Sequence, residues 1–586
     1  MSGSNRVAAG IFSSRIVGLL REILIGAILG RSISADAFRA AMRVPNMLQN
    51  LLGEGAISAS FVPVFARLVE EDNDQDSQRL ATSILGHLSV LVALLVALSI
   101  LLARPLVWIV TLGRWTGNRY EWAIELTRIT AAGAGLLVIS ALCLGILNSH
   151  RKYFLPYAAP MLWSGAQIVA LIGVLLFADI PEGATDFSSE SNVRNVLAWA
   201  VVVGSFLQLA VQWPSVRQLV PGFRPSLARG KYVDEVFKRF VPALTARGVI
   251  QLSSFLDLAL ASFLVAGAVA TLGMVAPLYL ISIGVFGFSV ATAELTEISR
   301  SGLLDAAVAR RVRIGIRRVL LPTGVVTPIL IFGAPIVVDG LYGWLNRLLP
   351  LATLSDSGLR VTGLTLAAFA LGLPAAMQAR VTQNALFALG DVRGPARISI
   401  IRLAIVAFSG FFLMLQLDHL AIADIDLDPR AAAISAQESV IETMDELGVE
   451  VADGMGGTIE VNGFPHWPVW EAQPPLVREA QLFDHLGPVG LGLASALASW
   501  AEFALLRRRL KKGVAGSVQS GIVINVAAGA AVVGVVTLTV RIFLANWLPS
   551  PVPLLILGPL ALTAYIGTLR VLGLGPAFHG STPAPS

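Results

Sequence analysis

The chain contains a single cysteine, Cys143, among 586 residues, which excludes a disulfide within it. Charged residues make up only 14%, against roughly 25% in a soluble domain, while hydrophobic residues make up 55%. The sequence has no Walker A loop, HExxH pair, nucleophile elbow or paired-cysteine metal pattern. Its six histidines are scattered, and no basic run is interleaved with aromatics. We therefore expect no enzyme activity, no metal, no cofactor and no nucleic-acid partner.

What the sequence does contain is apolar segments long enough to cross a bilayer, and its mean hydropathy is +0.73. A membrane-spanning helix needs about 20 mostly apolar residues. Fourteen candidates meet this length: roughly 7–29, 35–65, 81–103, 122–148, 155–178, 194–213, 240–265, 268–298, 314–339, 358–388, 396–416, 486–506, 517–545 and 551–574. The expected fold class is an all-α polytopic membrane protein with about 14 transmembrane helices.

The arginines and lysines between these segments predict the orientation. With the N-terminus inside, nearly all the cytoplasmic loops are basic, including 150–152, 217–239, 300–318 and 507–512. Cytoplasmic loops carry an excess of Lys and Arg. We expect a multi-pass protein with both termini in the cytoplasm.

One outer loop is unusually long and acidic. Residues 417–485 contain fourteen Asp and Glu, two Arg and no Lys. The helix-like stretch Ala431–Leu447 and the strand-like Thr458–Phe464 suggest a small insert. It is either an added soluble segment with no role in the core mechanism, or a docking element for an outer partner.

Charges within the first two apolar segments are the main functional signal. Arg15 and Arg21 share a broad face of the first helix, and Asp36, Arg39 and Arg43 fall on one face of the second. A charge at the bilayer centre costs at least about 2.5–3.5 kcal/mol on insertion scales. Two readings stay open: snorkelling arginines with an Asp36 pair that is neutralised locally, or a cationic wall for an anionic ligand. Arginine binds phosphate and carboxylate bidentately, which favours the wall.

The second segment also contains residues that interrupt a helix. Pro45 and Asn46 break the hydrogen-bond ladder, and Gly53, Glu54 and Gly55 add a flexible polar interruption. Such breaks are tolerated at membrane depth only against protein or water. We interpret these five residues as a gate or hinge.

This N-terminal stretch resembles the MurJ/MviN family of lipid II flippases, in the superfamily that also holds MATE exporters and polysaccharide flippases. The family usually reads SR-x-x-G, RD, TDAF, [KR]-[IL]-PN and AEGAFSQAFVPV there. The matching residues here are 14–18, 21–22, 35–38, 43–46 and 54–64. Later and weaker matches lie at 146–148, 251–264 and 388–395. The resemblance covers essentially the whole chain except the 417–485 insert.

The resemblance implies two pseudo-symmetric six-helix lobes followed by two C-terminal helices. The expected domains are an N-lobe at 1–220, a C-lobe at 221–416 and 486–512, the insert at 417–485, and two C-terminal helices with a short tail at 513–586. It also implies a flippase of the bacterial inner membrane, which moves lipid-linked peptidoglycan precursor outward by alternating access. That activity serves peptidoglycan biosynthesis and cell shape.

Carried over by position, Arg15, Arg21 and Asp36 fall in the family's cavity, and Glu54 matches its second-span acid. Two family arginines are missing, because Gln49 and Pro277 stand where they are expected. Arg39 and Arg247 are extra cations that can compensate, so the expected substrate cavity consists of Arg15, Arg21, Asp36, Arg39, Arg43 and Arg247. Asp257 matches an acidic ion-site position in some members.

Several alternatives remain open from the sequence. The cargo can be another polyprenyl-linked glycan, and a MATE-like drug exporter is a rival transporter. A non-transporting scaffold for cell-wall enzymes, bound through the insert, is the rival of another class. The expected partners are a lipid II-like oligosaccharide and membrane lipid, with a monomeric chain driven by membrane potential or a monovalent ion.

Overall fold

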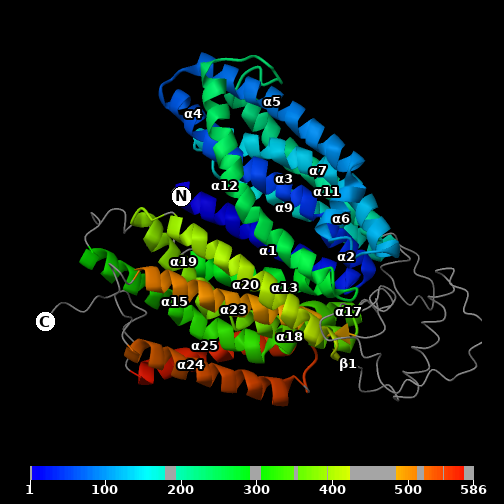
Figure 1. The fold of residues 1–586 in the computed structure, drawn as a ribbon, viewed down its shortest axis with the longest axis vertical. Helices are drawn as coiled ribbons and strands as arrows, with labels where there is room; N and C mark the ends of the chain where they lie inside the picture. The colour runs from blue at the N-terminus through cyan, green and yellow to red at the C-terminus, as the bar shows by residue number, and fades with distance from the viewer. Residues whose placement is uncertain are drawn as a thin grey trace, which may run out of the picture. The chain divides into compact units, whose positions relative to one another are not determined.

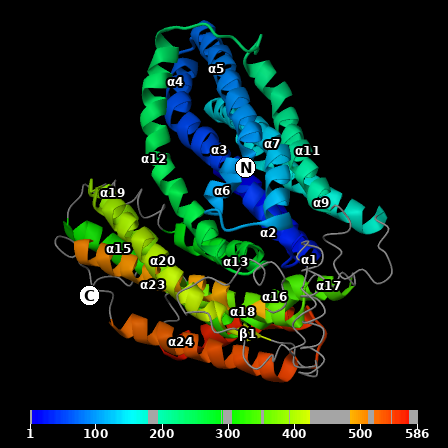
Figure 2. The same cartoon turned by 45° about the vertical axis from the view of Figure 1, so that its right-hand side comes forward.

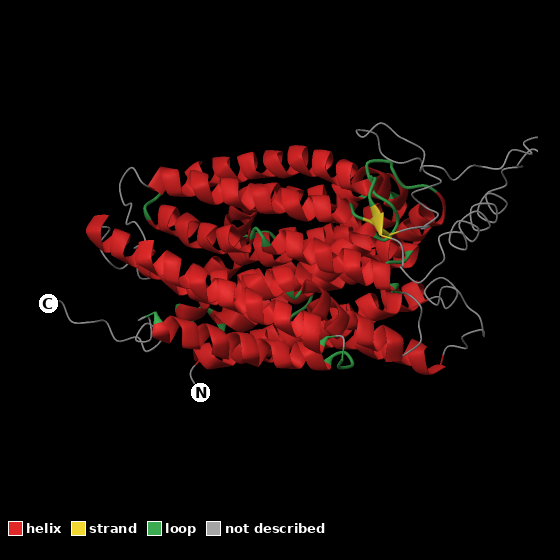
Figure 3. Ribbon diagram, turned by 90° about the horizontal axis from the view of Figure 1, so that it is seen from below, coloured by secondary structure: helices red, strands yellow, loops and turns green. Residues whose placement is uncertain are grey.

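The computed structural model describes residues 3–177, 193–288, 290, 305–348, 354–391, 393–422, 484–510, 520–545 and 547–572. These residues are almost entirely helical, with one pair of two-residue strands (Figure 3). The expected all-α membrane fold is confirmed. The predicted elements inside the acidic insert, Ala431–Leu447 and Thr458–Phe464, lie outside the described residues.

The chain divides by its internal contacts into two units, of which the first runs from Met1 to Ala270 with residues 351–353. Its elements, coloured blue to green in Figure 1, are α1 (Gly3–Leu29), α2 (Ile33–Ala41), α3 (Arg43–Leu48), η1 (Gln49–Ile57), α4 (Ser58–Glu70), α5 (Asp74–Leu101), α6 (Ala103–Val110), α7 (Gly117–Ser149), α8 (Phe154–Ala158), α9 (Pro160–Phe177), α11 (Val193–Leu219) and α12 (Lys231–Ala261).

The second unit begins inside α13 (Ala268–Ser282), at Thr271. It continues with η2 (Ile283–Phe288), α15 (Asp305–Phe332), α16 (Ala334–Val338), η3 (Asp339–Gly343), α17 (Trp344–Leu348), α18 (Asp356–Ala370), α19 (Leu373–Ala388), α20 (Arg393–Asp418), β1 (Ala421–Ile422), β2 (Asp484–His485), α23 (Gly487–Leu510), α24 (Ser520–Thr539), η4 (Val540–Leu544) and α25 (Val552–Val571).

Eleven helical segments in the described part of the chain are long and apolar enough to cross a membrane. Three further helices, α1, α12 and α13, correspond to the first, seventh and eighth predicted segments. The helix α13 is apolar but shorter than a full span. The helix α1 carries Arg15, Arg21 and Glu22 within its apolar sequence. Together these helices account for the fourteen predicted segments.

The second predicted segment is one bent helical run, Ile33–Glu70. Ser32 caps its start by accepting a hydrogen bond from the backbone N–H of Ala35 at 3.2 Å. The first part, α2, ends at Ala41, four residues before Pro45, whose ring removes one hydrogen bond of the ladder and clashes with the carbonyl four residues earlier. The next irregular part, η1, has π-helical geometry, which is rare and concentrates at functional sites.

The division by contacts differs from the predicted lobe boundary at residue 220. The helix α12, which we expected to open the C-lobe, contacts η1 and α4 and therefore groups with the first unit. Figures 1 and 2 both show α12 running beside α4. The charged residues of the candidate site described below lie in this first unit.

In the second unit, β1 and β2 join the two ends of the acidic insert. The strands pair antiparallel, with Ala421 opposite His485 and Ile422 opposite Asp484. The side chain of Asp484 accepts a hydrogen bond from Ser355 at 2.7 Å, at the N-terminus of α18. The chain therefore leaves the helical core for the insert and returns to it at neighbouring positions.

Candidate substrate-binding site in the first unit

Three charged side chains from the first two apolar segments meet in the first unit. Arg21 forms an ion pair with its neighbour Glu22, and the second carboxylate oxygen of Glu22 accepts from Nη1 of Arg39 at 3.3 Å. These side chains are between 14% and 17% exposed. The carboxylate therefore holds two guanidinium groups, one from α1 and one from α2.

Aromatic packing fixes the position of Arg21. Its guanidinium carbon lies 4.5 Å from the ring centroid of Trp163 in α9. A cation over an indole ring is worth about 0.5–2 kcal/mol, more when desolvated. Arg21 is therefore held on two sides, by a carboxylate and by a ring, before any ligand binds.

Arg43 extends the group towards α12. Its charge lies within electrostatic reach of Asp257 and of Arg39. Among the described residues Arg43, which is half-buried, makes no hydrogen bond or ion pair. A guanidinium in this state has all five donors available for an anion.

We call Arg21, Glu22, Arg39, Arg43 and Asp257 the charged cluster. It contains three cations and two anions, so its formal charge is +1. Arg21 lies eight residues before the end of α1, about 12 Å along the helix, and Arg43 lies ten residues into the second segment, about 15 Å. These depths fall well inside a hydrocarbon core about 30 Å thick. Charges placed so deep point to a polar site that favours an anionic group.

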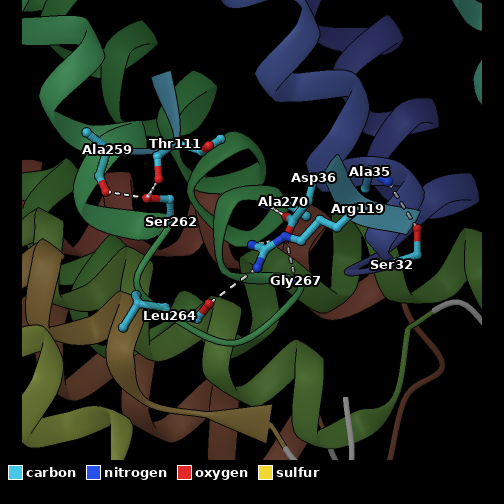
Figure 4. A network of polar contacts seen from close by, with 10 residues as sticks. All are labelled: Ser32, Ala35, Asp36, Thr111, Arg119, Ala259, Ser262, Leu264, Gly267 and Ala270. Atoms are coloured by element: carbon cyan, nitrogen blue, oxygen red, sulfur yellow. Dashed lines mark hydrogen bonds and ion pairs between the residues drawn. The ribbon is translucent and has the colours of Figure 1, made fainter. Parts of the chain in front are cut away.

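Asp36 is placed differently from the prediction. We expected it to pair with Arg39 or Arg43 on the same helix face, and this is wrong. Its carboxylate is fully buried and pairs with Arg119 of α7, with Nη2 and Oδ2 2.5 Å apart (Figure 4). Same-face spacing identifies possible partners only within one helix. An ion pair between two helices that is fully enclosed, such as Asp36–Arg119, is stronger than an ion pair open to solvent.

Backbone groups complete the surroundings of Asp36. Its two oxygens also accept from the backbone N–H groups of Gly267, at 2.8 Å, and Ala270, at 2.6 Å, where α13 begins. With these three donors the carboxylate is occupied by protein. Asp36 is therefore fully enclosed by protein groups in this structure, and its predicted place among the substrate ligands stays a prediction.

The remaining predicted residues are dispersed. Arg15 is exposed and lies six residues from Arg21, about 9 Å along α1, so it is not brought into the charged cluster. Pro45 is buried, Asn46 is exposed, and Gly53 is buried in η1. The side chains of Glu54, Gly55 and Arg247 lie outside the described residues. The gate role of the five interrupting residues stays a prediction.

Asp257 also stays a prediction as an ion site. The positive charge of Arg43 within its electrostatic reach disfavours a second cation there. Among the described residues no group of three or more His, Cys, Asp or Glu side chains is arranged to hold a metal.

Sequence reasoning missed three contributors. Glu22 enters the sequence analysis only as part of the matched positions 21–22, whereas in the structure it bridges to Arg39 in the next segment. Arg119 and Trp163 were not singled out at all. The only signal in the sequence was the place of these two residues within apolar segments. That signal is ambiguous, because arginine and tryptophan at such places are typical of membrane interfaces as well as of binding sites.

The second unit contains its own buried charges. Nε of Arg402 lies 3.3 Å from Oε2 of Glu502, which is 3% exposed, and Arg380 lies within electrostatic reach of both. Nη1 of Arg380 donates to Gln383 at 2.9 Å. Arginine is therefore present inside both units, although the notable N-terminal motifs lie only in the first.

Comparison with known proteins now identifies the family. The family model described as "Lipid II flippase MurJ" matches residues 25–424, more than half of the chain. The chain belongs to the MurJ family of lipid II flippases. The matched region includes Arg39, Arg43 and Asp257 of the charged cluster, while Arg21 and Glu22 lie just before it.

Individual MurJ proteins support the assignment. The chain is 29% identical over 411 residues to the probable lipid II flippase MurJ of Rhizobium tropici, covering 68% of this chain and 73% of that protein. It is 28% identical over 422 residues to the lipid II flippase MurJ of Burkholderia cenocepacia, covering 69% and 77%. The resemblance to the MurJ/MviN family is confirmed.

Solved structures agree on the MurJ fold. A lipid II flippase MurJ in an inward closed conformation superposes with a TM-score of 0.67 at 18% identity, covering 96% of this chain and 98% of that one. An inward-facing multidrug resistance MATE family transporter superposes with a TM-score of 0.53 at 13% identity, covering 88% and 100%. At these identities the likeness shows the fold alone.

Proposed function

We propose that this chain moves lipid II from the inner to the outer leaflet of the bacterial cytoplasmic membrane. The family assignment makes it a transporter and not an enzyme. The observation that carries the proposal for these residues is the charged cluster. Its net positive charge inside the first unit suits a diphosphate that must leave water while its prenyl tail remains in lipid.

The cluster divides the work among its members. Glu22 holds Arg21 and Arg39 in place when the site is empty, and Arg43 has donors left for an anion. A diphosphate entering the site competes with Glu22 for the two guanidiniums and takes up Arg43 directly. Hydrogen bonds between ionised partners are roughly twice as strong as neutral ones. When the diphosphate replaces Glu22, Arg21 and Arg39 exchange one such anionic partner for another and therefore stay paired.

The transport step follows from the architecture of the superfamily. In such transporters, rocking of one repeat against the other changes which side the site faces. Membrane potential is a sufficient energy source, since each unit charge moved across 100 mV contributes about 2.3 kcal/mol. A monovalent ion is the other candidate drive. The arginine-rich loops support an orientation with both termini in the cytoplasm, and we propose a monomer.

Two rival cargoes remain for testing. A MATE-like drug exporter is favoured by the second structural likeness, but its cationic substrates are repelled by a cluster of net charge +1. Another polyprenyl-linked glycan shares the diphosphate, and Gln49 and Pro277 at expected arginine positions leave room for it. The scaffold reading places its binding surface on the acidic insert.

The test combines complementation with reconstitution. A strain depleted of its own flippase is supplied with the wild-type chain, and purified protein in vesicles is assayed for movement of fluorescent lipid II. Arg43→Gln removes one charge-assisted contact, worth about 1.5–3 kcal/mol, and therefore weakens lipid II binding about 10- to 150-fold. Because Arg43 has no hydrogen bond to lose, the melting temperature should not fall.

The matched control is Arg104→Gln. Arg104 is also an arginine of the first unit, but its side chain is 58% exposed and paired with Glu121. This variant should transport normally. Lack of rescue by a well-expressed wild-type chain, together with no lipid II movement in vesicles, would overturn the proposal. Transport of another polyprenyl-linked glycan in place of lipid II would support the rival cargo.

A further inference from the structure

The Asp36–Arg119 pair is the most enclosed ion pair in the described part of the chain, with the two side chains 0% and 1% exposed. Breaking such a pair by removing one partner costs about 3–5 kcal/mol, whereas replacing both partners by apolar residues is often neutral. Its burial alone therefore does not explain its presence. The backbone groups that the pair contacts explain its presence.

Both partners act on the turn between α12 and α13 (Figure 4). Asp36 accepts from the backbone N–H of Gly267, the last residue of the turn, and from that of Ala270, in the first turn of α13. Arg119 donates from Nη1 to the carbonyl of Leu264, earlier in the same turn, at 3.4 Å. The two partners of one ion pair thus form hydrogen bonds with the backbone of the same turn at different positions.

The first turn of α13 offers N–H groups that no helix carbonyl can satisfy. A carboxylate at such a position also interacts favourably with the helix dipole. Asp36 supplies this carboxylate from α2, so it replaces the N-cap that the sequence of α13 itself lacks. Arg119 is in turn oriented by Trp115, whose ring centroid lies 4.1 Å from the guanidinium carbon.

The backbone at Gly267 leaves no space for a larger residue. Gly267 has φ of +86°, and a Cβ there would lie 2.4 Å from the carbonyl oxygen of Arg31. The contact between Arg31 and the turn is therefore possible only with glycine. Three elements, α2, α7 and the α1–α2 loop, fix this turn together.

The gripped residues are the last of the first unit, because the division by contacts falls between Ala270 and Thr271, inside α13. We propose that Asp36 and Arg119 form a clamp that keeps the first turn of α13 with the first unit, so that any change in α13 during transport begins beyond Ala270. In this reading Arg119 is a positioning residue, and neither side chain binds the cargo. The transport part rests on the proposed function.

The test removes both charged partners of the clamp together, so that neither Asp36 nor Arg119 is left buried without the other. Asp36→Leu combined with Arg119→Met takes away both charges at similar volume. We expect amide hydrogen exchange at Gly267 and Ala270 to accelerate at least about tenfold, since each loses a hydrogen bond to a charged group. Transport in vesicles should fall at least about tenfold, since small misplacements of an element cost that much, while the Kd for lipid II stays unchanged.

A second double variant with milder substitutions keeps the test decisive if the protein carrying Asp36→Leu and Arg119→Met is unstable. Asp36→Asn with Arg119→Gln retains one acceptor for the turn, so exchange and transport should both change less than in the first variant. The control is Arg104→Gln with Glu121→Gln, an exposed pair of the same chemistry in the same unit. It should leave exchange, transport and binding as in the wild type.

Three results would overturn the clamp. Wild-type exchange at Gly267 and Ala270 in the double variants would show that the turn is held by other contacts. Faster exchange with wild-type transport would show that the clamp has no part in the cycle. Weaker lipid II binding would return Asp36 and Arg119 to the binding site. If the wild-type chain moves no lipid II, the proposed function fails, and the exchange result still decides whether the clamp exists.

Discussion

The carboxylate of Glu22 provides the sharpest test of the charged cluster. Glu22 pairs with Arg21 and Arg39 at once, so a bound diphosphate must compete with it. Glu22→Gln keeps the size and one acceptor but raises the formal charge of the cluster from +1 to +2. We therefore expect this variant to bind the diphosphate more tightly than the wild type, which is unusual for a substitution inside a binding site.

The size of the effect follows from Coulomb's law. For a phosphate about 8 Å from the removed carboxylate, at an effective dielectric constant of about 20, the lost repulsion is about 2 kcal/mol. That corresponds to about 30-fold tighter binding. Because affinity changes of this kind act mostly on dissociation, release should slow and turnover should fall.

The assay measures the Kd of farnesyl diphosphate and of a short-chain lipid II on purified protein, together with the rate of movement in vesicles. Arg43→Gln, measured beside it, should shift the Kd in the opposite direction. A weaker Kd for Glu22→Gln would refute the competition argument, because it would mean that Glu22 serves the site only by holding the arginines in place.

Three further predictions concern positions outside the cluster. Gly267→Ala should lower the melting temperature, measured by thermal unfolding, because of its positive φ and its contact with Arg31; an unchanged value would contradict the geometry. The Arg509 guanidinium lowers the pKa of the Asp391 carboxyl, so its stabilisation should be complete above about pH 4 and be lost as the pH falls through the lowered value. The melting-temperature difference between wild type and Asp391→Asn should accordingly shrink in acid, and a constant difference would refute it. Replacing residues 423–483 by Asn-Gly should leave complementation largely intact, and loss of rescue at normal expression would favour the docking reading of the insert.

Helix spacing was sufficient to find the arginines of the cluster. Arg39 and Arg43 fall on one face of their segment, and Arg21 is too deep in its own segment for a surface role, so their importance follows from periodicity and membrane depth alone. The helical class and the number of segments follow from composition for the same reason. These are local properties; the structure confirms the helical class, and the role of the arginines in binding stays a prediction.

Partners distant in the chain could not be predicted in the same way. Asp36 and Arg119 are 83 positions apart, and no spacing rule connects α2 with α7. The sequence suggested a nearer partner for Asp36, because periodicity ranks only neighbours on the same helix. Trp163 against Arg21 is a second case, since its contact depends on how α9 packs beside α1. In both cases tertiary contacts between helices determined the partner of the charged side chain.

The strand pair β1–β2 has a consequence for experiments on living cells. Directly opposed residues in an antiparallel pair lie about 5 Å apart, so the strand pair brings together the two positions that flank residues 423–483. Lengthening such a closed loop is cheap, at about 0.6 kcal/mol for each doubling. The position between Ile422 and Asp484 is therefore a suitable port for an epitope or a fluorescent domain, through which the sidedness and abundance of the transporter can be read without altering a helix.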